Sequence, residues 1–302
     1  MTELLLPSGV DVAFTEIESA LLRPASEAGK ASGMALTATI VATGPPERLR
    51  DAEQAVSGLK DIGVRAVLIS HGDDPAPVPR VSHHVVALNG LRTDYLNNAV
   101  AALRLSSLPT LVWWRGGNAP NLEGLARLAD RLVLDAEDPE ELWARVEELA
   151  QHTSVTDLRW TRLTRWRALM AHFFDIPEVR AATEDFRTLR IEGSDMHTLR
   201  LFAGWILSII KRRDRLAFDL VRREGTAPIE TVVLGGRQEL VLRMAPSRTC
   251  VETSAQVRDL SSTSRIVSLG GQDLCALLGE ELRIRARDVA FERAVAASRN
   301  VS

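Results

Sequence analysis

Apolar residues in the first half of the chain follow two alternating patterns. Runs such as Met34–Thr43 and Val64–Ser70 are rich in β-branched residues and almost continuously apolar, which is typical of strands buried on both faces. Between these runs, from the prolines at 45 and 46 to Gly63, apolar residues recur at helical spacing. Strands and helices alternate in this way up to Gln151, and that order predicts a largely parallel, doubly wound sheet. We therefore expect residues 1–151 to form a Rossmann-like α/β domain.

The pattern changes in the second half. A polar link is expected at 152–158, and junction helices fill the rest of the region 152–186. From 187 to 302, short strands follow one another at turn signals such as Leu234-Gly-Gly-Arg237, which predicts an antiparallel sheet. A strongly apolar helix is expected from its cap at Asp195 to Ile210. This part of the chain therefore predicts an α+β domain.

Further elements are expected in both halves. In the first half they are strands at Ser82–Leu88, Thr110–Trp114 and Arg131–Asp135, and in the second half they are helices near 271–282 and 287–297.

Composition narrows the class of protein. The chain has 302 residues, of which 45% are hydrophobic, enough for two cores. A net charge of −3 gives no general attraction to nucleic acid or to an anionic membrane. The longest uncharged apolar run, Leu201–Ile210, is well short of the ~20 residues that span a bilayer. Two cysteines, Cys250 in an expected strand and Cys275 in an expected helix, favour inert thiols in a reducing compartment. We expect a cytoplasmic protein that binds neither nucleic acid nor membrane.

Signatures of catalysis are missing from the sequence. The turn after the first strand, Thr43-Gly-Pro-Pro-Glu47, has two prolines where a dinucleotide site needs glycines and backbone amides. No phosphate-binding loop and no nucleophile elbow occur. Several possible metal ligands lie close together in the sequence without the spacing of a known site: His71, Asp73, Asp74, His83 and His84. We expect no catalytic residue, no cofactor and no metal.

One turn of the first half could hold an anion. Arg115, Gly116 and Gly117 follow the strand Thr110–Trp114, at the carboxyl edge where such sheets bind ligands. An arginine beside two glycine amides could bind a phosphate. The other interpretation is a tight turn in which the tryptophans belong to the core and Arg115 caps a neighbour.

The junction carries four arginines and two tryptophans within nine residues. They are Arg159, Trp160, Arg162, Arg165, Trp166 and Arg167. On a helix, Trp166 shares an apolar face with Leu163 and Met170, which is most simply a core face. The arginines fit a core less well, because cations in the first helical turn cost ~0.3 to 1 kcal/mol each. They predict anionic partners, either carboxylates of this chain or an acidic surface of another protein. Both alternatives are open from the sequence.

Two motifs carry a resemblance to a known family. Leu108-Pro-Thr-Leu-Val-Trp-Trp-Arg115 and Trp160-Thr-Arg-Leu-Thr-Arg-Trp-Arg167 are together specific. Through them the whole chain resembles the glucose-6-phosphate dehydrogenase assembly proteins, an OpcA-like family. This resemblance implies a non-enzymatic partner that binds glucose-6-phosphate dehydrogenase, supports its active oligomer and acts as an allosteric activator. Such a protein would serve the pentose phosphate pathway, a part of carbohydrate metabolism, and its NADPH supply. The six Arg/Trp residues are then candidates for the protein–protein interaction. The alternative is a sugar-phosphate or nucleotide-binding enzyme or sensor that uses the turn Arg115-Gly116-Gly117.

Overall fold

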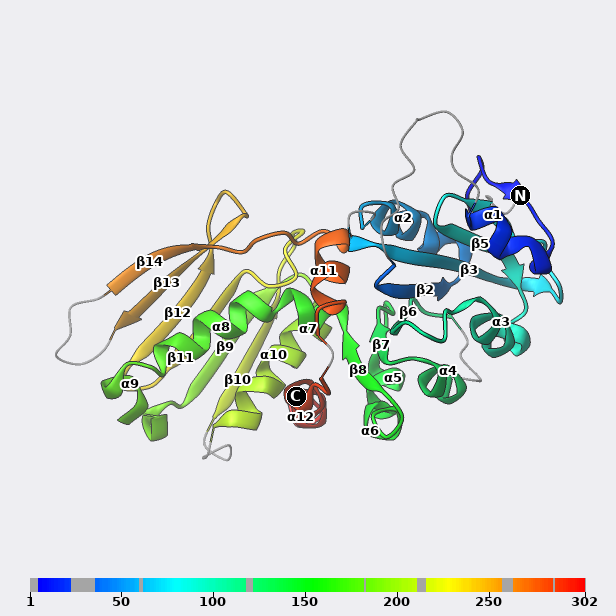
Figure 1. The fold of residues 1–302 in the computed structure, drawn as a ribbon. Coiled ribbons are helices and arrows are strands. Elements are labelled where there is room, and N and C mark those ends of the chain that lie inside the picture. The colour runs from blue at the N-terminus through cyan, green and yellow to red at the C-terminus, as the bar shows by residue number, and fades with distance from the viewer. Residues whose placement is uncertain are drawn as a thin grey trace. The chain divides into compact units, whose positions relative to one another are not determined.

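The chain forms two compact units, drawn in Figure 1. The computed structural model describes residues 5–22, 36–59, 62–117, 122–181, 183–210, 216–256, 263–284 and 286–301. The first unit comprises Met1–Leu158 and Asp273–Arg287, and the second comprises Arg159–Gln272 and Asp288–Ser302. The chain thus returns to the first unit late in its sequence, a feature that the apolar pattern did not predict.

The first unit is built on an eight-stranded sheet with the order β1-β4-β5-β3-β2-β6-β7-β8. All neighbours from β5 to β8 in this order are parallel, whereas β4 pairs antiparallel with both β1 and β5. The predicted largely parallel, Rossmann-like sheet is therefore confirmed. Its strands are β1 (Val10–Asp11), β2 (Ala38–Gly44), β3 (Val64–Asp74), β4 (Arg80–Ser82), β5 (Val85–Leu91), β6 (Thr110–Trp114), β7 (Arg131–Leu134) and β8 (Ser154–Asp157). Residues 34 and 35 of the expected first strand lie outside the described residues.

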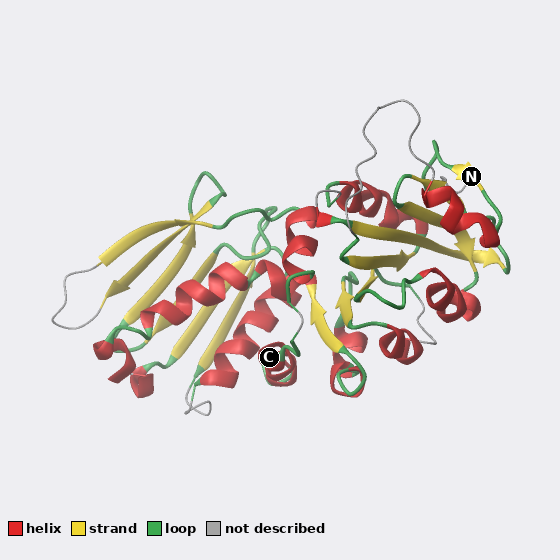
Figure 2. Cartoon of the chain, in the orientation of Figure 1, coloured by secondary structure: helices red, strands yellow, loops and turns green. Residues whose placement is uncertain are grey.

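Helices cover both faces of this sheet (Figure 2). On one face lies α2, whose residues Leu49, Ala52 and Val56 are buried in the core. This helix also contacts α11. Two leucines of α11, Leu277 and Leu278, enter the same apolar cluster. The other face carries α3 and α4. The helices of the unit are α1 (Ile17–Leu22), α2 (Pro46–Ser57), α3 (Leu96–Leu103), α4 (Leu122–Leu128), α5 (Glu140–Ala144), α6 (Val146–Leu149) and α11 (Leu274–Glu281), with short 3-10 turns at Phe14–Glu16 and Thr93–Tyr95.

The polar link expected at 152–158 is wrong, because its central residues form the buried strand β8. Two polar side chains of this strand, Ser154 and Asp157, are tolerated there because they have hydrogen-bond partners. The Ser154 hydroxyl accepts from Arg131 Nη1 at 2.8 Å and donates to the Ala286 carbonyl at 3.1 Å. Trp143 Nε1 donates to Asp157 at 2.9 Å. These partners lie far away in sequence, so the apolar pattern could not reveal the strand.

The single strand expected at Ser82–Leu88 also needs correction. The chain forms a hairpin instead, in which β4 and β5 are antiparallel. His83 adopts a positive φ of 52° at the turn, a conformation in which histidine is enriched among residues other than glycine. The expected strand starts at Ser82, so it includes the turn at His83 and omits most of β4.

The second unit contains a six-stranded sheet with the order β10-β9-β11-β12-β13-β14. The predicted hairpin at 234–237 is present, and all neighbouring pairs are antiparallel except β9 and β10, which are parallel. The antiparallel sheet predicted for this unit is thus mixed at one edge, because helix α10 connects β9 to β10 as a crossover. The strands are β9 (Thr188–Gly193), β10 (Ala217–Arg222), β11 (Thr231–Gly235), β12 (Glu239–Met244), β13 (Cys250–Gln256) and β14 (Thr263–Ser268).

Helices of the second unit complete an α+β arrangement. Asp195 caps α10 by accepting from the His197 amide at 3.1 Å, as the sequence predicts. The helix expected over the Arg/Trp segment is divided at Leu163 into α7 and α8. The helices are α7 (Leu158–Arg162), α8 (Thr164–Phe173), α9 (Pro177–Ala181), α10 (Met196–Ile209) and α12 (Val289–Ser298), with a 3-10 turn at Thr183–Asp185.

Candidate functional site

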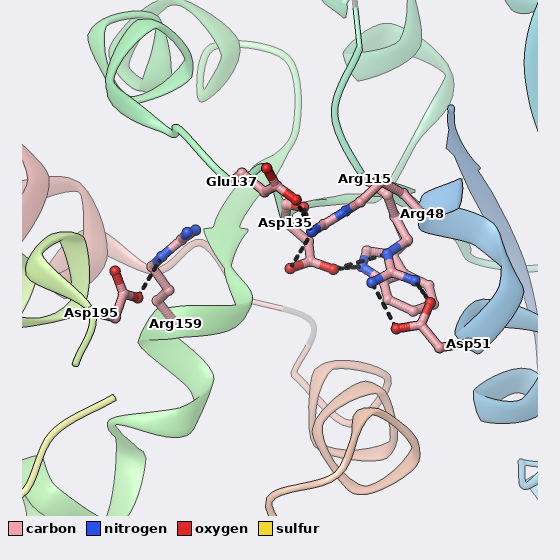
Figure 3. A network of polar contacts seen from close by, with 8 residues as sticks. Arg48, Asp51, Arg115, Asp135, Glu137, Arg159 and Asp195 are labelled. Carbon is pink, nitrogen blue, oxygen red and sulfur yellow. Dashed lines mark hydrogen bonds and ion pairs between the residues drawn. The ribbon is translucent and has the colours of Figure 1, made fainter. Parts of the chain in front are cut away.

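The carboxyl edge of the first sheet carries a connected set of ion pairs, shown in Figure 3. Arg115 follows β6, is only 4% exposed, and donates from Nε to Asp135 at 3.0 Å. Its terminal nitrogens donate to both carboxylate oxygens of Asp51 on α2. Arg48, also on α2, donates to the Asp135 carbonyl at 2.8 Å and to Glu137 at 3.0 Å. The Arg115 guanidinium therefore has carboxylate partners within its own unit.

The glycines of this turn have a structural reason. Gly116 and Gly117 have φ values of +99° and +95°, a backbone conformation that is unfavourable for every residue with a Cβ. A Cβ on Gly117 would also lie 2.8 Å from Nδ1 of His71. Arg115 further stacks on Trp113 with its guanidinium carbon 4.4 Å from the ring centre. The geometry matches the tight-turn interpretation, and an anion at Arg115 would have to compete with two carboxylates.

Neighbouring His71 lies in the second half of β3. Its Nε2 is 2.9 Å from the Thr43 hydroxyl, and its ring centre is 5.3 Å from that of Trp114. Burial lowers the pKa of His71 from 6.5 to about 4, because the charged imidazolium is poorly solvated there. The imidazole is therefore neutral at physiological pH.

Both tryptophans of the Arg/Trp segment belong to the core of the second unit. Trp160 and Trp166 are 1% and 2% exposed. The indole nitrogen of Trp160 donates to Asp288 at 2.7 Å, and its ring centre lies 5.9 Å from that of Phe291 on α12. Arg167 stacks on Trp160 at 3.5 Å and donates to the Trp160 carbonyl at 3.3 Å. These residues hold α7, α8 and α12 together.

One arginine of the segment forms a partly buried ion pair. Arg159 donates from Nε to Asp195 at 3.0 Å, as Figure 3 also shows. Burial by itself raises the pKa of the Asp195 carboxyl, but the hydrogen bond from Thr198 and the charge of Arg159 outweigh burial, so the pKa is lowered. The same carboxylate caps α10. Arg159 thus has the internal acidic partner that the sequence left open as one alternative.

Arg162 and Arg165 differ from the other arginines of the segment. Arg165 is exposed, and Arg162 is half-buried at the wall of a cavity in the second unit. Within the described part of the chain, neither guanidinium has an ion pair. The six predicted residues therefore separate into two groups. Trp160, Trp166, Arg159 and Arg167 have partners within the second unit, whereas Arg162 and Arg165 have no ion pair among the described residues. Sequence reasoning missed Arg248, Thr226 and Gln272 on the same cavity, since they come from distant turns.

Neither a membrane span nor a metal site is seen in the described ranges. No helix there is both long and apolar enough to cross a bilayer. No three side chains of His, Cys, Asp or Glu are grouped there as metal ligands would be. Cys250 and Cys275 are both half-buried, in strand β13 and helix α11 as expected. Burial raises the pKa of the Cys275 thiol, which lowers its reactivity.

Residues 153–295 match a family model that describes the C-terminal domain of a glucose-6-phosphate dehydrogenase subunit. The match begins at β8 and includes the whole Arg/Trp segment. Two curated relatives are both named OxPP cycle protein OpcA. The family match and both relatives support a likeness of this chain to the OpcA-like glucose-6-phosphate dehydrogenase assembly proteins. The resemblance that the two motifs indicate is therefore confirmed.

The OpcA-like relatives are distant and longer. The protein from Nostoc punctiforme is 24% identical over 253 residues, which cover 69% of this chain and 54% of the relative. The protein from Synechocystis is 28% identical over 125 residues, covering 38% of this chain and 26% of the relative. The chain thus spans about half the length of the first relative it matches.

A solved structure shares the fold of this chain. It is KijD10, a 3-ketoreductase from Actinomadura kijaniata in complex with NADP and TDP-benzene. The TM-score is 0.54 at 7% identity, over 88% of this chain and 97% of the reductase. At this identity the likeness supports the Rossmann-like architecture alone. In this chain Pro45 precedes α2 and Pro46 begins it, so both lack the amide donors that this helix end could otherwise offer.

Proposed function

We propose that this chain binds glucose-6-phosphate dehydrogenase and supports its active oligomer, as a non-enzymatic assembly factor and allosteric activator in the oxidative pentose phosphate pathway. The family match over 153–295 carries this proposal. The Arg/Trp segment lies inside the match, and two of its arginines, the exposed Arg165 and the half-buried Arg162, have no ion pair among the described residues. To activate, the chain must bind the active form of the dehydrogenase more tightly than the inactive form.

Arg165 is the residue that we assign to the contact. It is exposed near the N-terminal end of α8, where a cation is disfavoured by the helix dipole. Its charge therefore does not serve the helix itself. An acidic patch on the dehydrogenase would supply the missing partner and would speed association. Trp160 and Trp166 are buried and anchor the segment in the core of the second unit.

Charge reversal at Arg165 tests the proposal. In Arg165→Glu the helix gains a favourable acidic residue in its first turn, so folding should be retained. We expect the concentration needed for half-maximal activation of the dehydrogenase from the same source to rise at least about tenfold. Oligomer size, followed by analytical ultracentrifugation, should shift in parallel with activity.

A matched control comes from the same unit. Arg293 is an exposed arginine of α12, and Arg293→Glu makes the same change in charge. It should activate like the wild type. If the wild-type chain changes neither activity nor oligomer size over a concentration series, the proposed function is wrong. If both variants activate normally, the contact lies elsewhere on the chain.

The alternative of a sugar-phosphate or nucleotide enzyme or sensor at Arg115 has no comparable support. Asp51 and Asp135 occupy the donors of Arg115, and Gly116 and Gly117 are explained by their backbone conformation.

A further inference from the structure

A cavity of about 450 Å³ opens in the second unit, between the Arg/Trp segment and turns of the sheet. Its size is within the ~300–1,000 Å³ of typical small-molecule pockets. Arg162 and Trp166 contribute from α7 and α8, and Arg248 from the turn between β12 and β13. The rest of the wall is mostly apolar, with Ile229 among its buried residues. A ligand would therefore meet a charged rim and an apolar wall.

The charges around this cavity are unbalanced. Its lining contains the two arginines Arg162 and Arg248 and no aspartate or glutamate. Arg248 donates to the neutral hydroxyl of Thr226, and Arg162 has no ion pair within the described ranges. The nearby carboxylate of Asp195 is already occupied by Arg159 and Thr198. Two guanidinium groups thus face a concave space without an anion of this chain.

Arg248 is also held in an unfavourable backbone conformation. Its φ is +57°, a left-handed conformation that is unfavourable for a residue with a Cβ. The turn is closed by the Arg248 amide, which donates to the Ala245 carbonyl at 2.9 Å. Glycine would make this turn at lower cost. Strain of this kind occurs at ligand sites, where the side chain rather than the turn is needed.

We propose that this cavity binds a small organic phosphate. The phosphate oxygens would accept hydrogen bonds from Arg162 and Arg248, and the organic part would lie on the apolar wall beside Trp166. A phosphate monoester carries a charge of about −1.5 to −2 at pH 7, which balances two guanidinium groups better than one carboxylate does. The inference does not depend on binding to the dehydrogenase, because the isolated chain contains the whole site.

Calorimetric titration of the isolated chain tests this site with four probes. Phenyl phosphate combines both features, inorganic phosphate lacks the ring, benzoate replaces the phosphate by a carboxylate, and benzyl alcohol has no charge. We expect phenyl phosphate to bind at least about tenfold more tightly than each of the others. Its affinity should fall as salt is raised, because the interaction is partly ionic.

Two variants separate binding from folding. Arg248→Gly removes a guanidinium and places a residue without a Cβ at the positive φ. Its melting temperature should therefore be equal to or above that of the wild type. Phenyl phosphate should bind to it at least about tenfold more weakly. Arg162→Gln should weaken binding to a similar extent. Arg293→Gln, an exposed change in the same unit outside the cavity, should bind like the wild type.

Four results would overturn the proposal. One is the absence of phenyl phosphate binding at millimolar concentration to the folded chain. A second is binding that survives in both Arg162→Gln and Arg248→Gly. A third is equally tight binding of benzoate, which would make the pocket a general anion site. The last is binding of a phosphoserine peptide but not of phenyl phosphate, which would identify a phosphorylated protein as the occupant.

Discussion

At the scale of single residues, His71 shows how a side chain in the sheet edge is fixed in one protonation state. The imidazole contacts Thr43 and Trp114, and it lies so close to Gly117 that a Cβ there would clash with it. Burial lowers its pKa to about 4, while the unfolded chain keeps the ordinary 6.5. Between these pH values the unfolded state binds more protons than the folded state, so stability rises with pH.

The pH dependence of unfolding should therefore change in His71→Gln. In the wild type, the contribution of neutral His71 is fully present above pH 6.5 and is lost as the pH falls towards 4, a change on the order of 3 kcal/mol at most. Urea unfolding at several pH values in this window should give a smaller slope for the variant. His84→Gln, at an exposed position, should keep the wild-type slope. Equal slopes for all three proteins would contradict the assigned cause.

Arginine residues show what can be predicted from sequence at this scale. Their crowding at 159–167 indicated anionic partners, and Arg159 has one in Asp195. The sequence could not identify that partner, because 36 residues separate the two. For Arg115 the sequence allows both an anion site and a tight turn. Only the positions of Asp51 and Asp135 distinguish these two interpretations. Residue type predicts the kind of partner, whereas the fold selects it.

At the scale of elements, two helix glycines occupy opposite environments. Gly204 lies where α10 crosses α12, and a Cβ there would be 2.3 Å from the Ala294 carbonyl oxygen. Gly279 on α11 has room, because its Cβ would meet Leu59 and Ile62 at 3.7 and 3.8 Å. The first glycine permits close helix packing, while the second only raises the entropy of the unfolded chain.

Alanine at these two positions should therefore have opposite effects. Gly204→Ala should lower the free energy of unfolding by about 1–3 kcal/mol, because backbone atoms of α12 must move. Gly279→Ala should raise it by about 0.5–1 kcal/mol, as expected for alanine in a helix. Chemical denaturation of both variants measures the two values. Similar stabilities of the variants would show that α10 and α12 are not as close as described.

Elements with a strong local pattern could be predicted, and elements that depend on distant partners could not. The α10 cap at Asp195 and the hairpin at 234–237 follow from local chemistry, and both are confirmed. Strand β8 was missed because it carries polar residues, of which Ser154 and Asp157 are paired with residues elsewhere in the fold. The parallel pairing of β10 was missed because strand direction is set by the crossover through α10.

At the scale of the whole molecule, the first unit depends on a segment from late in the chain. Leu277 and Leu278 of α11 are buried in the same cluster as Leu49 and Leu158. Glu281, 1% exposed, forms an ion pair with Arg131 of β7. Loss of one partner of such a buried pair costs about 3–5 kcal/mol. A fragment without α11 should therefore be poorly folded.

Fragments provide the test. Residues 1–158 alone should bind a hydrophobic dye and melt without a sharp transition, because apolar surface under α11 is exposed. The same residues joined through a flexible linker to 273–287 should melt cooperatively and bind little dye. Thermal unfolding followed by circular dichroism distinguishes the two. A sharp, identical transition in both fragments would mean that α11 is dispensable for this unit.

Neither the composition of the first unit nor the cavity of the second could be predicted from sequence. The apolar pattern divides the chain into consecutive segments, whereas 273–287 returns to the first unit after the second sheet has formed. Residues of α7, α8, α10, the end of β12 and three separate turns line the cavity. Both features depend on how distant segments meet, which local periodicity does not contain.

The late position of α11 has a consequence for synthesis on the ribosome. Residues 1–158 leave the ribosome first, but their partner helix follows only after Gln272. At about 5–20 residues per second, the interval lasts on the order of ten seconds, during which the apolar side of α2 and the Arg131 guanidinium lack α11. The nascent chain must therefore keep its first unit soluble and incomplete while the second is still being made.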